Sequence, residues 1–98
     1  MQINNRIKQE IIDQLLIYEP EFIGLFGSYM RNEATKNSDL DILVSFNKRI
    51  TLIDLSRMKN KLHEKLNLKI DLVTQQSLDS KIMPYIEKDL QIIYNAQK

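Results

Sequence analysis

Hydrophobic residues recur every three or four positions over residues 3–16. This one-sided spacing is typical of an amphipathic helix, and Pro20 closes the segment because the residue before a proline is biased away from helical backbone. The pattern then changes to a short apolar run at 22–26, which has the length of a buried strand and stops at Gly27-Ser28. We therefore predict a helix, followed by a strand that ends in a tight turn.

A second strand is predicted over residues 40–46, where apolar and polar residues alternate with the two-residue period of a strand. Leu43 makes the outer face of this strand partly apolar as well. Between the two strands, residues 29–38 are polar and have the length of a loop with room for one helical turn.

A second helix is predicted after Thr51, which forms a variant of the capping box with Asp54 and precedes an apolar stripe that continues to residue 66. Residues 68–73 alternate again and predict a third strand.

The end of the chain predicts one more helix and one more strand. Ser77 is the expected N-cap of a helix that continues through residue 86 and that Pro84 kinks or divides. Residues 91–94 are expected to add a fourth strand at the edge of the sheet. This order of elements predicts an α+β fold, an α/β-type sandwich of helices on a sheet.

Composition limits what the protein can be. With 98 residues, 43% hydrophobic and 28% charged, the sequence predicts one globular domain over residues 1–98. A net charge of +1 makes nucleic acid an unlikely partner, because no overall field attracts the chain to it. No segment has the length of a membrane helix or the features of a signal peptide, and cysteine is absent, so we expect a cytoplasmic protein without a membrane partner.

Two carboxylates, Asp39 and Asp41, stand two positions apart at the start of the second predicted strand. Alternate residues of a strand face the same side, so these acids repel each other unless a cation lies between them. Mg²⁺ suits such oxygen ligands and is commonly bound together with substrate phosphates. Asp71 adds a third carboxylate in the third predicted strand. If the two strands are neighbours, the three acids converge as two-metal nucleotidyl transfer requires.

Gly27 and Ser28 have the chemistry of a phosphate site. Glycine lets the backbone approach a phosphate closely, and the following amides and the Ser28 hydroxyl can donate hydrogen bonds to its oxygens. Tyr29, beside this turn, is a further residue that could touch a nucleotide.

Simpler interpretations exist for each of these residues. Asp39 and Asp41 could be solvated acids at a turn, and Asp71 could pair with Lys69 or a nearby arginine. His63 has no companions at ligand spacing, which favours a packing role. The basic residues of the second predicted helix form a solvated face or a docking surface for an acidic partner; they are Arg57, Lys59, Lys61 and Lys65.

Three segments together resemble the motifs of the minimal nucleotidyltransferases (MNT) of the DNA polymerase β-like superfamily. They are Gly27-Ser28 with Arg31, then Ser38-Asp39-Leu40-Asp41, then Ile70-Asp71-Leu72-Val73. The resemblance covers roughly residues 3–94 and implies the polymerase β-like nucleotidyltransferase fold, a mixed sheet of three to four strands packed by helices. It further implies an antitoxin that transfers AMP from ATP to a tyrosine hydroxyl of a HEPN toxin, the product of a neighbouring gene.

The resemblance also implies roles for individual residues. Asp39, Asp41 and Asp71 would be catalytic and would bind the metal, with two Mg²⁺ ions expected, and Asp71 would help to activate the acceptor hydroxyl. Gly27 and Ser28 would contact the triphosphate of ATP. Arg31 matches a basic position that either meets phosphate or holds the loop. Asn32 stands where the family commonly has glycine, and since Asn tolerates left-handed backbone we expect only a modest local change.

Other functions stay open at the level of sequence. The protein could be a non-catalytic antitoxin that neutralises its toxin by binding alone. It could instead be a transferase for a small molecule, although so short a chain has little structure to spare for holding such an acceptor. Transfer to RNA is disfavoured by the balanced charge, while the basic second helix keeps it possible.

Overall fold

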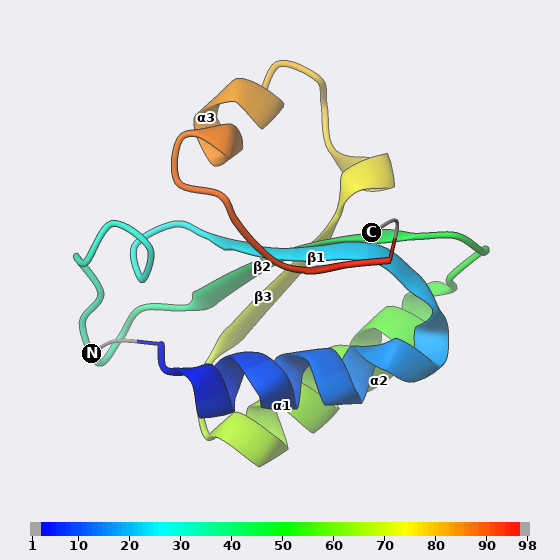
Figure 1. The fold of residues 1–98 in the computed structure, drawn as a ribbon, viewed down its shortest axis with the longest axis horizontal. Helices are drawn as coiled ribbons and strands as arrows, with labels where there is room; N and C mark the ends of the chain where they lie inside the picture. The colour runs from blue at the N-terminus through cyan, green and yellow to red at the C-terminus, as the bar shows by residue number, and fades with distance from the viewer. Residues whose placement is uncertain (1–2, 97–98) are drawn as a thin grey trace.

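The computed structural model describes residues 3–96 and contains one four-stranded mixed sheet with helices on both sides. The elements follow in the order α1 (Asn5–Leu15), the 3₁₀ turn η1 (Leu16–Tyr18), β1 (Pro20–Phe26), β2 (Leu40–Phe46), α2 (Leu52–Leu66), β3 (Ile70–Thr74), the 3₁₀ turn η2 (Gln75–Ser77), α3 (Met83–Glu87) and β4 (Gln91–Asn95). This confirms the predicted α+β class (Figure 1).

The sheet has the strand order β3-β2-β1-β4. Strand β1 pairs antiparallel with both β2 and β4, while β2 and β3 are parallel. A parallel pair needs a long crossover connection, and here that connection is α2. The fourth strand is confirmed at the edge next to β1.

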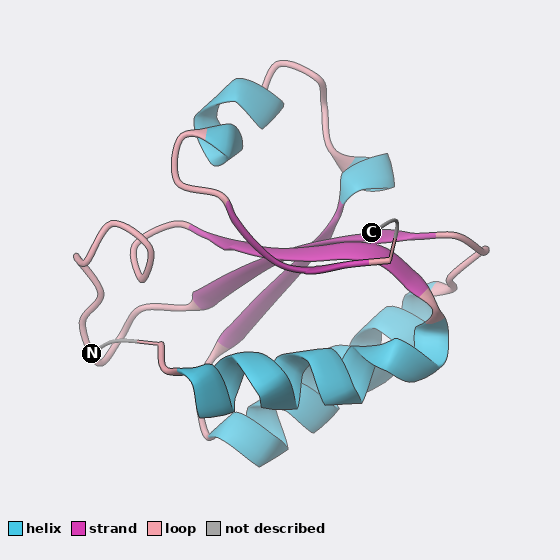
Figure 2. Cartoon of the chain, in the orientation of Figure 1, coloured by secondary structure: helices cyan, strands magenta, loops and turns pink. Residues whose placement is uncertain are grey.

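The hydrophobic core lies between the sheet and the layer formed by α1 and α2 (Figure 2). Alternate residues of β2 point into it, and Leu40, Ile42 and Val44 are fully buried. The opposite face of the sheet is covered by the segment that contains η2 and α3. There Leu43 is also fully buried, as its apolar character in the sequence indicated.

Local signals fix where the two long helices begin. The Asn4 side chain accepts a hydrogen bond from the Ile7 backbone N–H at 2.9 Å and caps α1. Helix α2 begins with the predicted capping box, because Thr51 accepts from the Asp54 N–H and Asp54 accepts from the Thr51 N–H, both at 3.1 Å. Glu19 ends the first helical segment in left-handed backbone, with φ of 56°, directly before Pro20.

The prediction of a long last helix is wrong. Helix α3 begins only at Met83, and Pro84 stands in its first turn, where the missing N–H costs no hydrogen bond, so the proline starts the helix rather than kinking it. Ser77 is not an N-cap: it belongs to η2, and its hydroxyl donates to the Thr74 carbonyl at 2.9 Å. The third strand also begins two residues later than expected.

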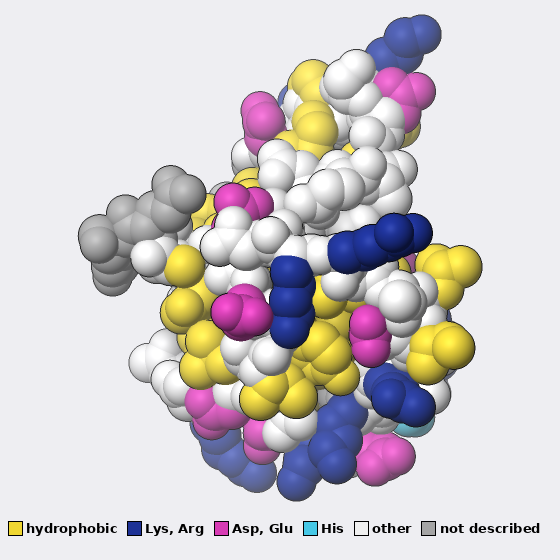
Figure 3. Space-filling view, turned by 90° about the vertical axis from the view of Figure 1, so that its right-hand side faces the viewer, with side chains coloured by type: hydrophobic (Ala, Val, Ile, Leu, Met, Phe, Trp, Pro, Cys, Tyr) yellow, Lys and Arg dark blue, Asp and Glu magenta, His cyan; other side chains and the backbone are white. Residues whose placement is uncertain are grey.

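Several large apolar side chains are exposed at one end of the helical layer. Ile17 follows α1 and is 74% exposed, while Leu52 and Ile53 begin α2 and are 84% and 65% exposed. Figure 3 views this end of the molecule and shows hydrophobic side chains among charged ones. No helix within residues 3–96 is long and apolar enough to span a membrane.

Thr51→Ala should lower the free energy of unfolding by about 1 kcal/mol, because the Asp54 N–H then loses its acceptor. Urea denaturation followed by circular dichroism measures this change. Thr51→Ser is the matched control, since it keeps the hydroxyl and should stay close to the native protein. Equal losses in both variants would mean that the methyl group of Thr51, and not the cap, carries the effect.

Candidate active site

The parallel pairing of β2 with β3 brings two of the predicted carboxylates together. Asp41 and Asp71 are direct partners in the register, and their side chains share a hydrogen bond. Asp39 precedes β2 and is close enough to act electrostatically on Asp41. The structure therefore places all three acids at one end of the sheet, where β2 and β3 begin.

The pKa of Asp41 shows how these acids interact. The pKa is raised to about 6, and partial burial is the largest cause. The charge and hydrogen bond of Asp71 and the charge of Asp39 raise it further. Arg31 opposes this shift with its positive charge. With a pKa of about 6, Asp41 is half protonated at about pH 6 and mostly ionised at neutral pH.

The carboxylate oxygens of Asp39, Asp41 and Asp71 are the type of ligand that a divalent cation binds, but these carboxylates do not surround a common point. Within the described residues, no three acidic, histidine or cysteine side chains form a preformed metal site. Burial is the largest cause of the raised pKa of Asp41, and the negative charges of Asp71 and Asp39, which a bound cation would offset, raise it further. Oxygen ligands of this type are those that Mg²⁺ prefers.

The turn after β1 lies directly against Asp41. Gly27 has φ of +81°, and a Cβ atom there would collide with the Asp41 carboxylate and lie 3.0 Å from its Cγ. Only glycine satisfies both the backbone conformation and this close approach. Phe26, the residue before it, is the register partner of Asp41.

The same turn contains hydrogen-bond donors without a partner among the described residues. The Gly27 carbonyl accepts from the N–H groups of Met30 and Arg31, which forms the single helical turn expected in this loop. By contrast, within residues 3–96 the N–H groups of Ser28 and Tyr29 and the Ser28 hydroxyl donate no hydrogen bond. Such donors beside Asp41 are suited to phosphate oxygens.

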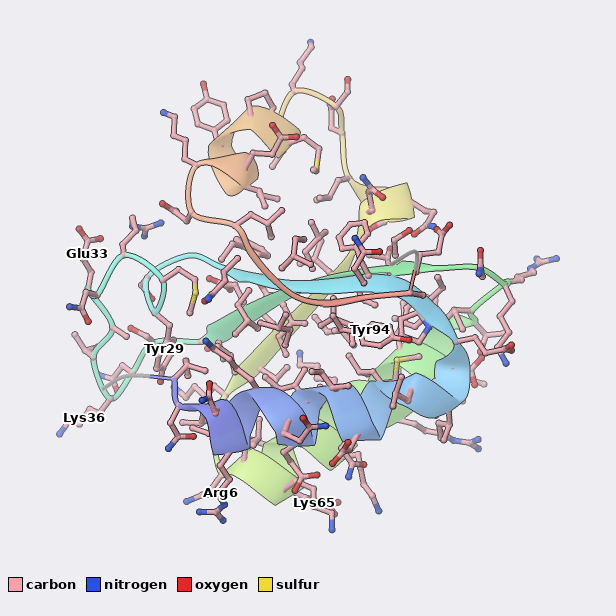
Figure 4. All side chains as sticks on the ribbon, in the orientation of Figure 1. Arg6, Tyr29, Glu33, Lys36, Lys65 and Tyr94 are labelled. Carbon is pink, nitrogen blue, oxygen red and sulfur yellow. The ribbon has the colours of Figure 1, made fainter. Side chains whose placement is uncertain are left out.

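Asn32 ends this turn in left-handed backbone with φ of 63°. This is the conformation that explains a glycine in the family, and asparagine adopts it at modest cost. Glu33 and Lys36, further along the loop, point away from the body of the protein (Figure 4).

Arg31 forms two ion pairs. Its Nε donates to Glu33 at 2.9 Å and its Nη1 donates to Asp89 at 2.7 Å. Asp89 lies 58 positions further along the chain, so this contact ties the loop to the segment between α3 and β4. The structure supports the loop-holding role for Arg31, while a phosphate contact stays a prediction. Asp89 carried no signal in the sequence, because nothing local marks it as a partner.

Tyr29 is part of the hydrophobic core. Its side chain is only 5% exposed. In Figure 4 it lies on the side of the sheet that carries α1 and α2. This burial argues against the suggestion that Tyr29 touches a nucleotide.

The fold and these residues together define a class of protein: nucleotidyltransferases, which place carboxylates and a Gly-Ser turn at one end of a mixed sheet. Residues 5–94 match the family model described as a nucleotidyltransferase domain. The chain belongs to this family, within it to the minimal nucleotidyltransferases, and it is a nucleotidyltransferase enzyme.

Known proteins resemble the chain over most of its length. The protein adenylyltransferase MntA of Thermococcus cleftensis is 36% identical over 83 residues, which are 85% of this chain and 81% of the relative. A crystal structure of a toxin–antitoxin with AMP-PNP matches with a TM-score of 0.82 and 26% identity, over 92% of this chain and 74% of that one.

A third match is a chain in the structure of a tri-AMPylated Shewanella oneidensis HEPN toxin in complex with MNT antitoxin. Its TM-score is 0.78 over 97% of this chain and 75% of that chain, and at 23% identity it bears on the fold alone. The polymerase β-like nucleotidyltransferase fold is thereby confirmed.

Asp41→Asn should stabilise the protein at neutral and alkaline pH when no divalent cation is present. The folded-state pKa of about 6 lies above the ordinary 3.8, so ionisation of Asp41 opposes folding increasingly as pH rises from about 4 to 6. After a discount for solvent screening, we expect a gain on the order of 1 kcal/mol at about pH 8 and none below about pH 4.

Thermal unfolding of both proteins across this pH range measures the gain. Glu64→Gln, which neutralises an exposed carboxylate on α2, is the control and should not reproduce it. If Asp41→Asn is no more stable than the native protein at pH 8, burial and the acidic neighbours do not destabilise the ionised Asp41 carboxylate.

Proposed function

We propose that this protein is an antitoxin that transfers AMP from ATP, in the presence of Mg²⁺, to a tyrosine hydroxyl of a HEPN toxin encoded by a neighbouring gene. The observation that carries the proposal is the meeting of Asp39, Asp41 and Asp71 beside the Gly27-Ser28 turn. The adenylyltransferase MntA and the toxin–antitoxin structure with AMP-PNP support the same activity.

The chain's own residues have distinct tasks in this reaction. Ser28 and the free amides of the turn bind the triphosphate of ATP. Asp71 orients the acceptor hydroxyl and takes its proton as the hydroxyl oxygen bonds to the α-phosphorus, while the bond to pyrophosphate breaks. Asp39 and Asp41, with Asp71, would hold Mg²⁺, which when bound neutralises phosphate charge and lowers the pKa of the attacking hydroxyl.

We further propose that residues 1–98 form a single minimal nucleotidyltransferase domain that acts in the cytoplasm. The family match over residues 5–94 and one hydrophobic core cluster support the first part. The absence of cysteine is compatible with a reducing compartment and supports the second.

The double variant Asp39→Asn, Asp41→Asn should lose AMP transfer while it keeps the fold. The test is the intact mass of the neighbouring gene's product after co-expression with native or variant protein. We expect a gain of whole AMP units with the native protein only, its loss when divalent cations are chelated in a purified reaction, and its loss when the modified tyrosine is replaced by phenylalanine.

The matched control is Asp13→Asn, Asp79→Asn, which neutralises two exposed carboxylates elsewhere and should leave transfer intact. If neither native nor variant protein adds mass, yet both form a stable complex and protect cells, the protein is a non-catalytic antitoxin. Protection by the variant at the native level would contradict an enzymatic role in neutralisation.

A further inference from the structure

The chain between α3 and β4 lies on the face of the sheet to which Asp41 points. Alternate residues of β2 point to opposite faces, and since Leu40 and Ile42 enter the core between the sheet and the long helices, Asp41 points to the other face. That face is covered by η2, α3 and the chain that follows α3 (Figure 2). Asp89, which lies between α3 and β4, therefore approaches the candidate active site from this face.

Asp89 is held in place by the two residues that follow it. Gln91 is the register partner of Leu25 in β1. Leu90 packs on the same strand at Gly24, where a Cβ atom would lie 2.6 Å from the Leu90 Cδ1 atom. The absence of a side chain at Gly24 is thus what lets Leu90 lie against β1. These contacts give Asp89 a fixed position relative to the turn that follows β1.

The Arg31 guanidinium lies between Asp89 and the carboxylates of the candidate active site. Its Nη1 donates to Asp89 at 2.7 Å, and its Nε donates to Glu33 at 2.9 Å. Its charge also lowers the pKa of Asp41, although by less than the acidic neighbours of Asp41 raise it. Apart from these two pairs, Arg31 forms no ion pair within residues 3–96. The guanidinium is therefore near the carboxylates of the site but held apart from them.

Of the two partners of Arg31, Asp89 is the one that can fix the guanidinium. The Glu33 side chain is 65% exposed and lies two positions from Arg31 on the same loop, and so exposed a pair contributes little. The Asp89 side chain is only 18% exposed and belongs to a different part of the fold. Partly buried pairs are screened less by solvent and salt, so the pair with Asp89 is the stronger of the two.

We propose that Asp89 is a positioning residue, which holds Arg31 away from the carboxylates of the site and so leaves them free to bind a divalent cation. The inference rests on the proposed function, in which Asp39, Asp41 and Asp71 would hold Mg²⁺. Without the charge of Asp89, the guanidinium is attracted to these uncompensated carboxylates. An arginine paired with Asp41 offsets the negative charge that a divalent cation needs.

A merely structural tie between the turn and the α3–β4 connection predicts a different result. If the ion pair only fixes the turn, removal of Asp89 alone and removal of both partners have the same effect. If Asp89 restrains a competing cation, removal of Arg31 as well makes Asp89 unnecessary. The two roles are therefore distinguished by whether loss of Arg31 restores what loss of Asp89 impairs.

The test compares Asp89→Asn with the double variant Arg31→Gln, Asp89→Asn. Mn²⁺ alone is the probe, and its electron paramagnetic resonance signal measures binding without ATP or a partner protein. Binding should weaken by about fivefold or more in Asp89→Asn, the effect of one competing charge close to the site. It should return to the native level in the double variant. Because the double variant lacks the same ion pair, this recovery cannot come from a restored tie.

Two controls accompany these variants. Glu87→Gln removes an exposed carboxylate from the end of α3 and should bind Mn²⁺ as the native protein does. Asp39→Asn, Asp41→Asn should bind none, which assigns the probe to the carboxylates of the site. In AMP transfer, the half-saturating Mg²⁺ concentration should rise in Asp89→Asn and return in the double variant, while the rate at saturating Mg²⁺ changes much less.

Two results would overturn the inference while the proposed function stands: Asp89→Asn binds Mn²⁺ as tightly as the native protein, or the double variant binds no better than Asp89→Asn. The second result would assign the ion pair to holding the turn alone. Native protein that binds no Mn²⁺, or binding that survives in Asp39→Asn, Asp41→Asn, would also overturn it. If the Mn²⁺ affinities follow the expected pattern but the native protein transfers no AMP, the proposed function fails and the positioning role of Asp89 stands.

Discussion

The parallel register of β2 and β3 is the constraint on which the site depends. It places Asp41 opposite Asp71, and two like charges at this spacing oppose each other. The apolar residues on the other face of the same strands fix the register, because a shift by one residue would turn Leu40, Ile42 and Val44 away from the core. Burial of the core thus holds together acids that would otherwise separate.

The same register determines the rest of the molecule. Parallel strands require a crossover, so α2 must pack on the sheet, and its far end then reaches the starts of β2 and β3. On the other side of β2, the Gly27 backbone lies so close to Asp41 that no side chain fits. One helix and one turn therefore flank the carboxylates because of how the sheet is connected.

Much of this could be predicted from the sequence, and the exceptions have a common physical origin. Periodicity predicted α1, α2, β2 and β3, and short apolar segments predicted β1 and β4. Motif spacing predicted that the three acids and the Gly27-Ser28 turn lie near one another. The length of α3 was overestimated. The prediction started the helix at Ser77 and placed Pro84 in its interior, whereas Pro84 belongs to its first turn. The Arg31–Asp89 pair and the lysines beside Asp39 depend on tertiary placement, which no local pattern encodes. Tyr29 was suggested as a nucleotide contact because it follows the turn in sequence. Adjacency in sequence does not show which way a side chain points, and Tyr29 points into the core.

The sheet order also explains why charge is unevenly distributed around the carboxylates. On the β1 side, neutral donors of the turn approach Asp41, and the nearest cation, Arg31, is already paired with Glu33 and Asp89. On the β3 side, Lys59 and Lys69 have no such partners. A triphosphate that arrives with its own metal ions needs few protein cations, because those ions neutralise it.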